Sequence, residues 1–260
     1  MSMEDFRKDL SPGSSVDHVV AVLSGKGGVG KSLVCALMAS ELRRMGYEVA
    51  VMDADITGPS IPKAFGVKGP VTLTQENLML PPQSETGIKM LSSNLLLGKE
   101  EDPVIVRGPV IAGMVTQFWT DTDWGHVDYM LIDMPPGTGD VPLTVFQSLP
   151  AEYAVMVTSP QELAAMVVKK AVNMANKMDI DLLGVVENMS YYVCPDCGKQ
   201  HQVFGPSHIE EISAGYGLSV LSRIPIDPEI SKMVDNGNVY DIDPGYIRDT
   251  VKALLDAEKS

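Results

Sequence analysis

The stretch Gly25-Lys26-Gly27-Gly28-Val29-Gly30-Lys31-Ser32 decides how this chain folds and what it can bind. It satisfies the pattern G-x-x-x-x-G-K-[ST], in which glycines let backbone N–H groups turn inward around phosphate groups. In that pattern the lysine, here Lys31, contacts the outer phosphates, and the hydroxyl, here Ser32, is a ligand of Mg²⁺. The N-terminus of the following helix adds positive potential. The sequence therefore predicts that these eight residues bind ATP together with Mg²⁺.

Apolar runs on both sides of this loop predict an α/β fold. His18 to Ser24 is typical of a buried parallel strand, and residues 32–45 read as a helix closed by Gly46. Alternating strands and helices predict a mostly parallel sheet with helices on both faces, of the P-loop NTPase type. We expect a flexible leader over residues 1–17 and one ATPase domain over 18–260. The other predicted strands are 48–52, 88–91, 129–132, 153–158 and 182–186, and predicted helices include 110–119 and 162–177.

The composition limits the partners that we expect. The 260 residues carry a formal net charge of −14, and a surface this acidic repels nucleic-acid backbones and anionic lipids. No apolar run approaches the length of a membrane span, and the polar N-terminus lacks the features of a signal peptide. We therefore expect a cytoplasmic protein that binds neither nucleic acid nor membrane.

Lys26, directly after the first glycine of the loop, narrows the class. A lysine at this place resembles the deviant Walker A ATPases, which include septum-site and partition ATPases and the nitrogenase iron protein. The resemblance implies that Lys26 reaches across a dimer to the phosphates held by the partner subunit. ATP binding would then depend on how two subunits are arranged.

Two aspartate loops follow strands that should end beside the phosphate loop, because functional loops gather at the carboxyl ends of parallel strands. Asp133 closes the run 129–132 in the Walker B arrangement, where it is expected to hold Mg²⁺. Asp53 and Asp55 follow the run 48–52. Resemblance to the class places Asp53 near the Mg²⁺ shell and gives Asp55 the role of orienting or deprotonating the attacking water. With Lys26 and Lys31, Asp55 completes the predicted catalytic set.

Two later positions are candidates for contact with the nucleotide base. Asn188 follows the run 182–186, and its amide offers both a donor and an acceptor, which suits the edge of adenine. In the class that this chain resembles, the corresponding asparagine contacts the base. Pro225 lies where relatives wrap adenine, largely with backbone atoms.

Cys194 and Cys197 form a C-x-x-C knuckle within residues 191–205. This spacing lets two thiolates converge on one metal, but a tetrahedral zinc and a [4Fe–4S] cluster each normally take four ligands. The chain has no second C-x-x-C. A twofold dimer in which each subunit donates its pair therefore satisfies the coordination, and His201 or His208 completing a zinc site within one chain is the alternative.

Together these motifs resemble the Mrp/ApbC family of iron–sulfur cluster carrier ATPases, over about residues 18–230. The matching pieces are the signature-lysine loop and the segments 53–60, 124–140, 187–190 and 194–197. The resemblance implies a homodimer that binds a [4Fe–4S] cluster and transfers it to apo iron–sulfur proteins. ATP, hydrolysed slowly with Mg²⁺, would govern the exchange.

Three other functions remain open at this point. A partition or cell-division positioning ATPase would need a basic face or a cationic tail, which the acidic chain lacks. A nucleotide switch whose knuckle binds Zn²⁺ and holds the dimer together is not separated from the carrier by sequence, since thiolates accept both metals. An ATP-driven electron donor like the nitrogenase iron protein would have its cluster cysteines far apart in sequence, unlike this pair.

Overall fold

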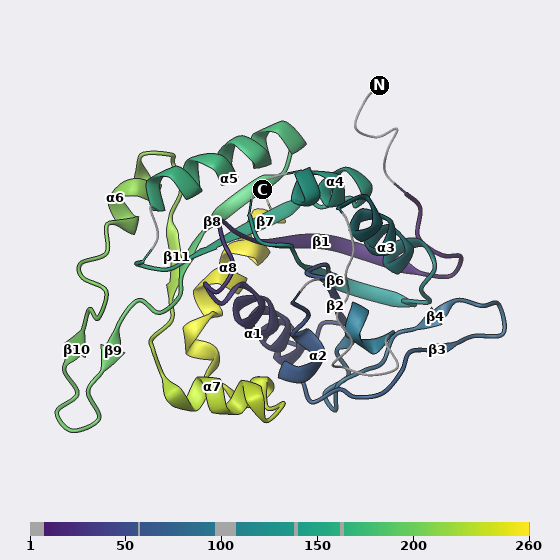
Figure 1. Cartoon of the computed structure of the whole chain (residues 1–260), viewed down its shortest axis with the longest axis horizontal. Coiled ribbons are helices and arrows are strands. Elements are labelled where there is room, and N and C mark those ends of the chain that lie inside the picture. The colour runs from purple at the N-terminus through teal and green to yellow at the C-terminus, as the bar shows by residue number, and fades with distance from the viewer. Residues whose placement is uncertain (1–7, 57, 97–107, 138–139, 162–163, 260) are drawn as a thin grey trace.

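The computed structural model describes residues 8–56, 58–96, 108–137, 140–161 and 164–259 of the chain. Its centre is a parallel sheet of seven strands in the order β11-β8-β7-β1-β6-β2-β5 (Figure 1). The strands of this sheet are β1 (Ser15–Ser24), β2 (Val49–Asp53), β5 (Lys89–Leu91), β6 (His126–Asp133), β7 (Tyr153–Thr158), β8 (Asp181–Glu187) and β11 (Val220–Arg223).

Helices cover both faces of the sheet, and each layer packs on its own apolar core. One core joins the sheet to α1, α2, α7 and α8, and the other joins it to α3, α4, α5 and α6 (Figure 1). The predicted fold class is confirmed. The helices are α1 (Lys31–Arg44), α2 (Ile61–Ala64), α3 (Gly108–Thr120), α4 (Asp140–Ser148), α5 (Ala164–Met178), α6 (Ile209–Ala214), α7 (Pro228–Asp235) and α8 (Arg248–Ala257).

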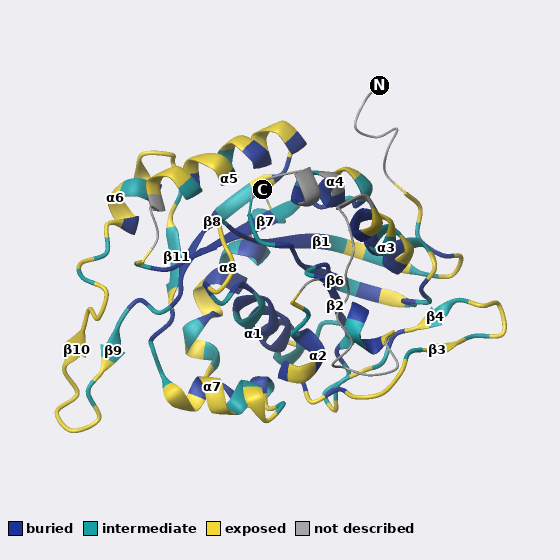
Figure 2. Cartoon of the chain, in the orientation of Figure 1, coloured by how far each residue is buried: buried dark blue, intermediate teal, exposed yellow. Residues whose placement is uncertain are grey.

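The carboxyl halves of the central strands are the most deeply buried part of the sheet (Figure 2). Strand β1 alternates over its first residues and is then buried from Val19 to Ser24. Continuous burial of this kind requires apolar residues on both faces, which is why the strands appear in the sequence as apolar runs. In the ladder between β2 and β6, Asp53 pairs with Asp133. The two aspartate loops therefore begin side by side.

Two strands begin three residues earlier than predicted. Strand β1 begins at Ser15, so residues 15–17, expected in the leader, belong to the sheet. The segment before it also contacts the body, since Trp119 Nε1 donates a hydrogen bond of 2.8 Å to the Lys8 carbonyl. Strand β6 begins at His126 and not at Tyr129. Both extensions alternate polar residues with a valine, and a search for continuous apolar runs therefore misses them.

Short or exposed elements were also missed. Strand β11 has four residues of intermediate or high exposure. Two hairpins stand apart from the main sheet, β3 (Thr72–Leu73) with β4 (Met79–Leu80), and β9 (Tyr192–Val193) with β10 (Gln200–His201). The β9–β10 hairpin projects from the body beside α6 and α7 (Figure 1).

The C-terminal helix α8 packs onto the core, as its apolar face predicts. Ile247, Val251 and Leu254 are each at most 1% exposed. In the part of the chain that the structure describes, no helix combines the length and apolar character needed to cross a membrane.

Candidate functional site

The phosphate loop connects the carboxyl end of β1 to the start of α1 and borders a cavity of about 430 Å³. Gly28 and Gly30 have φ angles of 84° and 83°, a conformation that favours glycine. A Cβ built on Gly30 would also lie 2.0 Å from Asn188 Nδ2. The lining of this cavity includes Lys26, Gly27, Gly28, Gly30, Lys31, Ser32, Asp55 and Pro136.

Asp133 is the centre of the polar contacts at this cavity. One of its carboxylate oxygens lies 2.6 Å from Lys31 Nζ, and the other accepts a hydrogen bond of 2.5 Å from Ser32 Oγ. Asp55 Oδ2 approaches the same ammonium at 3.7 Å. The structure therefore brings together the predicted lysine, the predicted Mg²⁺ hydroxyl and the aspartates of both loops, which come from three different strand ends.

Asp53 serves a different purpose in this geometry. It is fully buried, and its Oδ2 accepts hydrogen bonds from the backbone N–H of Ser60 and of Ile61 and from the hydroxyl of Ser92. Its Oδ1 accepts one from the Asp55 backbone N–H, at 3.1 Å. Through these contacts Asp53 holds the loop that carries Asp55, and it is not among the residues that line the cavity. Its place near the Mg²⁺ shell stays a prediction.

The electrostatics of the cluster suit an added cation. Burial raises the pKa of Asp53 to about 8, and the neighbouring Asp133 adds to that rise. Burial also raises the pKa of Asp133, against the opposing effect of Lys31. For Lys31, burial lowers the pKa, but Asp133, Asp55 and Asp53 together more than offset this, and the pKa lies above its ordinary value. A single lysine thus faces three carboxyl groups, and Mg²⁺ bound beside Ser32 and Asp133 would balance that excess of acid.

A second cavity, of about 640 Å³, adjoins the first, and Gly30 and Met189 line both. Its other lining residues are mostly apolar and include Leu33, Ile226, Pro228 and Ile230. The predicted base contacts Asn188 and Pro225 are both part of this lining. A polar cavity next to a mostly apolar one matches the two ends of a nucleotide.

Two details of the Asn188 loop were not predicted. Asn188 Nδ2 donates a hydrogen bond of 2.9 Å to the Val29 carbonyl, so its amide also holds the phosphate loop. Met189, the next residue, has a φ angle of 56°, a left-handed conformation that is uncommon outside glycine. Sequence gives no signal for the Asn188 hydrogen bond, because it joins residues 159 positions apart. It gives none for the φ angle of Met189 either.

Lys26 lies exposed at the mouth of the phosphate cavity. Its own carbonyl accepts a hydrogen bond of 3.0 Å from Ser24 Oγ, which fixes the backbone there. Among the described residues no carboxylate pairs with its ammonium group. Lys26 is thus exposed beside the cavity, and its reach to the phosphates of a partner subunit stays a prediction.

Residues 191–205, the cysteine arm, carry Cys194 and Cys197 on the turn between β9 and β10. Neither cysteine forms a disulfide, and Cys197 is exposed. Hydrogen bonds from Cys194 N to the Lys199 carbonyl and from Gly198 N to the Cys194 carbonyl form the turn. Backbone N–H groups of Cys197 and Asp196 point at the Cys194 sulfur and hold the pKa of that thiol below its ordinary value. Such a thiol is prepared to bind metal as a thiolate.

The two thiols have no further protein ligand beside them in one chain. Within the described residues, no third His, Cys, Asp or Glu forms with them a group whose ligand atoms all lie within 4.8 Å of one another. His201 and His208 therefore do not complete a four-ligand site with the cysteines in this conformation.

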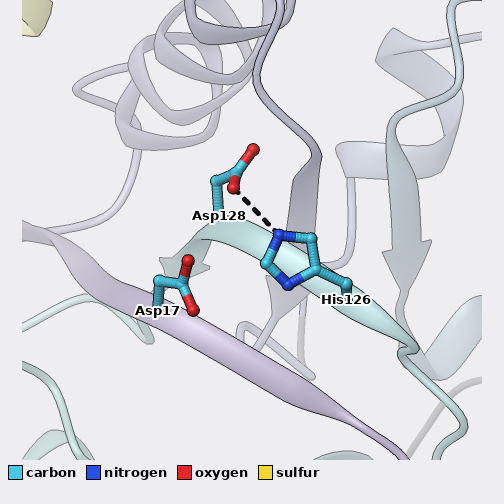
Figure 3. A group of neighbouring side chains, drawn as sticks. All are labelled: Asp17, His126 and Asp128. Carbon is cyan, nitrogen blue, oxygen red and sulfur yellow. Dashed lines mark hydrogen bonds and ion pairs between the residues drawn. The ribbon is translucent and has the colours of Figure 1, made fainter.

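Among the described residues, one group of three such side chains does have its ligand atoms within 4.8 Å of one another, and it lies at the amino ends of β1 and β6. Asp17, His126 and Asp128 face one another there, with His126 Nε2 at 3.0 Å from Asp128 Oδ1 (Figure 3). His126 Nδ1 lies 3.1 Å from Ser15 Oγ, and Asp128 also accepts a hydrogen bond from the Glu48 backbone N–H. The group is a mostly exposed histidine–aspartate hydrogen bond with a further carboxylate, at the end of the strands opposite the phosphate loop.

The strand, glycine loop and helix, with aspartates at the ends of two neighbouring strands, place the chain in the class of nucleotide-binding P-loop NTPases. The match to a family model is more specific. The model described as ParA, NUBPL iron-transfer P-loop NTPase, matches residues 15–255, and the chain belongs to that family. The resemblance to iron–sulfur cluster carrier ATPases is confirmed.

Individual relatives agree with this family assignment. The iron-sulfur cluster carrier protein of Clostridium perfringens is 45% identical over 230 residues, which cover 86% of this chain and 81% of that protein. The protein of the same description from Methanocaldococcus jannaschii is 43% identical over 225 residues, covering 86% and 78%.

Solved structures include proteins that are similar to this chain in fold. The nucleotide-binding protein of Archaeoglobus fulgidus, in complex with ADP and with Co found by PIXE, has a TM-score of 0.81 and 42% identity over 89% of this chain and 91% of that chain. The septum site-determining protein MinD of Pyrococcus horikoshii, complexed with Mg-ADP, has a TM-score of 0.62 and 21% identity over 94% of this chain and 97% of that chain. The second likeness shows the fold alone.

Proposed function

We propose that this protein is an ATP-hydrolysing carrier that binds a [4Fe–4S] cluster across a homodimer and transfers it to apo iron–sulfur proteins. One observation carries the proposal: the same chain has a formed phosphate site and, on a projecting arm, two reduced cysteines, of which Cys194 has a thiol pKa below its ordinary value. The relatives that are described as iron-sulfur cluster carrier proteins, at 43–45% identity, support it.

At the nucleotide site, each side chain has a proposed role. Lys31 and the backbone of residues 25–30 bind the phosphates, and Ser32 and Asp133 hold Mg²⁺, with Asp53 supporting the loop beside them. Asp55 faces the cavity and positions the water that attacks the γ-phosphate, giving ADP and phosphate. Phosphoryl transfer depends mainly on such positioning and on neutralised charge. Asn188 and Pro225 border the space for adenine.

We infer the homodimer from the number of protein ligands that a cluster needs. Two thiols per chain leave a four-ligand cluster half coordinated, and the described residues supply no third ligand within one chain. A twofold pair of arms would supply four thiolates, and Lys26 of each subunit is free to reach the partner's phosphates. The cluster is the cargo, and apo-proteins that require it are the proposed recipients. We expect the carrier to work in the cytoplasm.

Anaerobic reconstitution with iron and sulfide tests the proposal. The parent protein should bind about four iron and four sulfide per two chains, as a [4Fe–4S] cluster requires. It should then restore the activity of an apo-enzyme that needs such a cluster. A Cys194→Ala/Cys197→Ala double variant should bind neither iron nor sulfide. If that variant binds as much cluster as the parent, the carrier function is wrong.

A matched control uses the third cysteine. Cys35 lies fully buried in α1, so a Cys35→Ala variant should reconstitute like the parent. The same samples distinguish the carrier from a nucleotide switch whose cysteines bind zinc. If the purified dimer holds Zn²⁺ at the cysteines and does not exchange it for a cluster during reconstitution, the zinc switch is the better description.

A further inference from the structure

Glu187, the last residue of β8, is a buried carboxylate with no role in the nucleotide chemistry proposed above. It is 1% exposed. Its Oε2 accepts a hydrogen bond from Ser190 Oγ, and its Oε1 accepts one from Ser207 Oγ. Arg223 Nε lies 3.6 Å from Glu187 Oε2, and Arg223 Nη2 lies 2.8 Å from Glu210 Oε1. A buried carboxylate costs free energy unless it is hydrogen-bonded and paired, and here the two hydroxyls and the arginine meet that need.

The two serines that bind Glu187 lie on either side of the cysteine arm. Ser190 immediately precedes it, and Ser207 follows it by two residues. Each serine uses a different oxygen of the one carboxylate, so both ends of the arm are fastened to the end of β8. The arm gains little orientation from apolar packing, because its side chains Val193, Val203 and Phe204 are 40–58% exposed.

Glu187 is also next in sequence to residues that line the two nucleotide cavities. Asn188 follows it, donating to the Val29 carbonyl of the phosphate loop. Met189, in its left-handed conformation, lines both cavities and connects Asn188 to Ser190. A nucleotide that displaces the backbone of residues 188–189 must therefore change the position of Ser190 relative to Glu187.

A second connection runs through other residues that line the cavity of about 640 Å³ proposed for adenine. Ile226, which lines that cavity, donates a backbone hydrogen bond of 2.6 Å to the carbonyl of Tyr191, the first residue of the arm. Ser190 N donates to the Ile224 carbonyl at 2.9 Å. The start of the arm is thus hydrogen-bonded to the segment that borders the base, while Glu187 holds both of its ends.

We propose that Glu187 is a positioning residue that couples the nucleotide site to the cysteine arm, so that nucleotide binding changes the affinity of Cys194 and Cys197 for metal. The proposal rests on the proposed function in that it needs both sites to bind their ligands, and it adds the physical link between them. Coupling of this kind is reciprocal: metal on the arm changes the affinity for nucleotide by the same factor.

The test measures Co²⁺ binding to the cysteines of the full-length protein, anaerobically, through the thiolate-to-metal absorption band. That band is specific for sulfur ligation, so Co²⁺ at the Mg²⁺ position does not contribute. The Kd for Co²⁺ is compared without nucleotide, with Mg-ADP and with a non-hydrolysable Mg-ATP analogue. In the parent protein we expect the Kd to change at least fivefold with one of the nucleotides, the lower end of the range of about 5–150-fold for coupled sites.

Two variants interrupt the link at different points. Ser207→Ala removes the far attachment, together with the hydrogen bond of 3.2 Å that the Ser207 hydroxyl accepts from the Ile209 backbone N–H. Glu187→Gln keeps the shape of the side chain but removes its charge. In both, the Kd for nucleotide should stay within about threefold of the parent, while the nucleotide-dependent change in Co²⁺ affinity falls below about twofold, under the range typical of coupled sites. Ser207→Ala carries the test if Glu187→Gln does not fold.

Ser213→Ala is the matched control, because the Ser213 hydroxyl is buried in α6 without a hydrogen-bond partner in the described structure. It should keep the coupling of the parent. If both link variants keep that coupling too, Glu187 does not connect the sites. If the parent binds Co²⁺ and nucleotide with no effect of one on the other, the coupling is wrong while the proposed function stands. If the parent binds no Co²⁺ at the cysteines, both proposals fail.

Discussion

Lys31 Nζ lies 2.6 Å from Asp133 Oδ1, and both side chains are almost completely buried, at 6% and 0% exposed. Lys31 comes from the phosphate loop and Asp133 from the end of β6, 102 residues later. The pair therefore connects the two segments that the proposed chemistry brings together on ATP and Mg²⁺. A buried pair of this kind contributes little net stability, but breaking it leaves a charge without a partner.

The first prediction concerns the removal of Lys31. Lys31→Ala leaves the buried Asp53 and Asp133 without a nearby cation, and we expect it to lower the free energy of unfolding by about 3–5 kcal/mol. It should also abolish measurable nucleotide binding. Urea denaturation and titration with a fluorescent nucleotide check the two effects.

The control for this prediction is a solvent-exposed ion pair of similar length. Lys63 Nζ lies 2.7 Å from Asp235 Oδ1, but both side chains are about two-thirds exposed. Lys63→Ala should change the free energy of unfolding by no more than about 1 kcal/mol. Equal losses from the two variants would mean that burial does not decide the strength of the Lys31 contacts.

The second prediction separates binding from hydrolysis at Asp55. Its side chain is 14% exposed and lies 3.7 Å from Lys31 Nζ, at the edge of the phosphate cavity. Asp55→Asn keeps the size of the group and removes its ability to accept a proton, so kcat for ATP hydrolysis should fall by about 10²–10⁴-fold. Affinity for Mg-ADP should stay within about threefold of the parent, because this affinity comes from the glycine loop and Lys31. Release of inorganic phosphate measures the first effect, and hydrolysis at the parental rate would remove Asp55 from its role.

The third prediction compares two glycines of the same loop. At Gly30 the φ angle is 83°, and an added Cβ would lie 2.0 Å from Asn188 Nδ2, so Gly30→Ala must displace Asn188 or the loop. We expect it to lower the free energy of unfolding by about 2–3 kcal/mol, from strain and crowding together. At Gly27 a Cβ would meet no atom within 4 Å. Gly27→Ala should therefore change stability by less than about 0.5 kcal/mol. Thermal and urea unfolding distinguish the two, and a fully stable Gly30→Ala variant would contradict the prediction.

Much of the nucleotide site could be predicted because its parts are continuous in sequence. The motif from Gly25 to Ser32 carries its own strand, turn and helix signals. Asp133 was placed correctly since it closes an apolar run, and the carboxyl ends of parallel strands meet at one edge of a sheet. The prediction for Asp53 was less complete: sequence put it near Mg²⁺, whereas its contacts with Ser60 and Ser92 come from segments that no local pattern links to it.

The attachment of the cysteine arm shows what local sequence does not contain. Glu187 and Ser207 are 20 residues apart, and their contact depends on how the arm folds back onto β8. Ser207 belongs to no motif, and the segment 187–190, although it matches the family, does not indicate this contact. The first residues of β1 were missed for a related reason, because Ser15 and Val16 pair with His126 and Val127 of β6 through the backbone, which depends little on the side chains present.

The last prediction concerns Lys26 and the dimer. Its side chain is exposed beside the phosphate cavity and has no carboxylate partner in the described structure, so it is available to the phosphates of a second subunit. Lys26→Ala should bind Mg-ADP as the parent does, since one chain's own loop supplies that contact, but it should lose dimerisation induced by a non-hydrolysable ATP analogue. Light scattering at several protein concentrations measures the mass. Lys68→Ala, which removes an exposed lysine away from the loop, should dimerise like the parent. A Lys26→Ala variant that dimerises with ATP analogue as readily as the Lys68→Ala control would show that the subunits meet without this lysine.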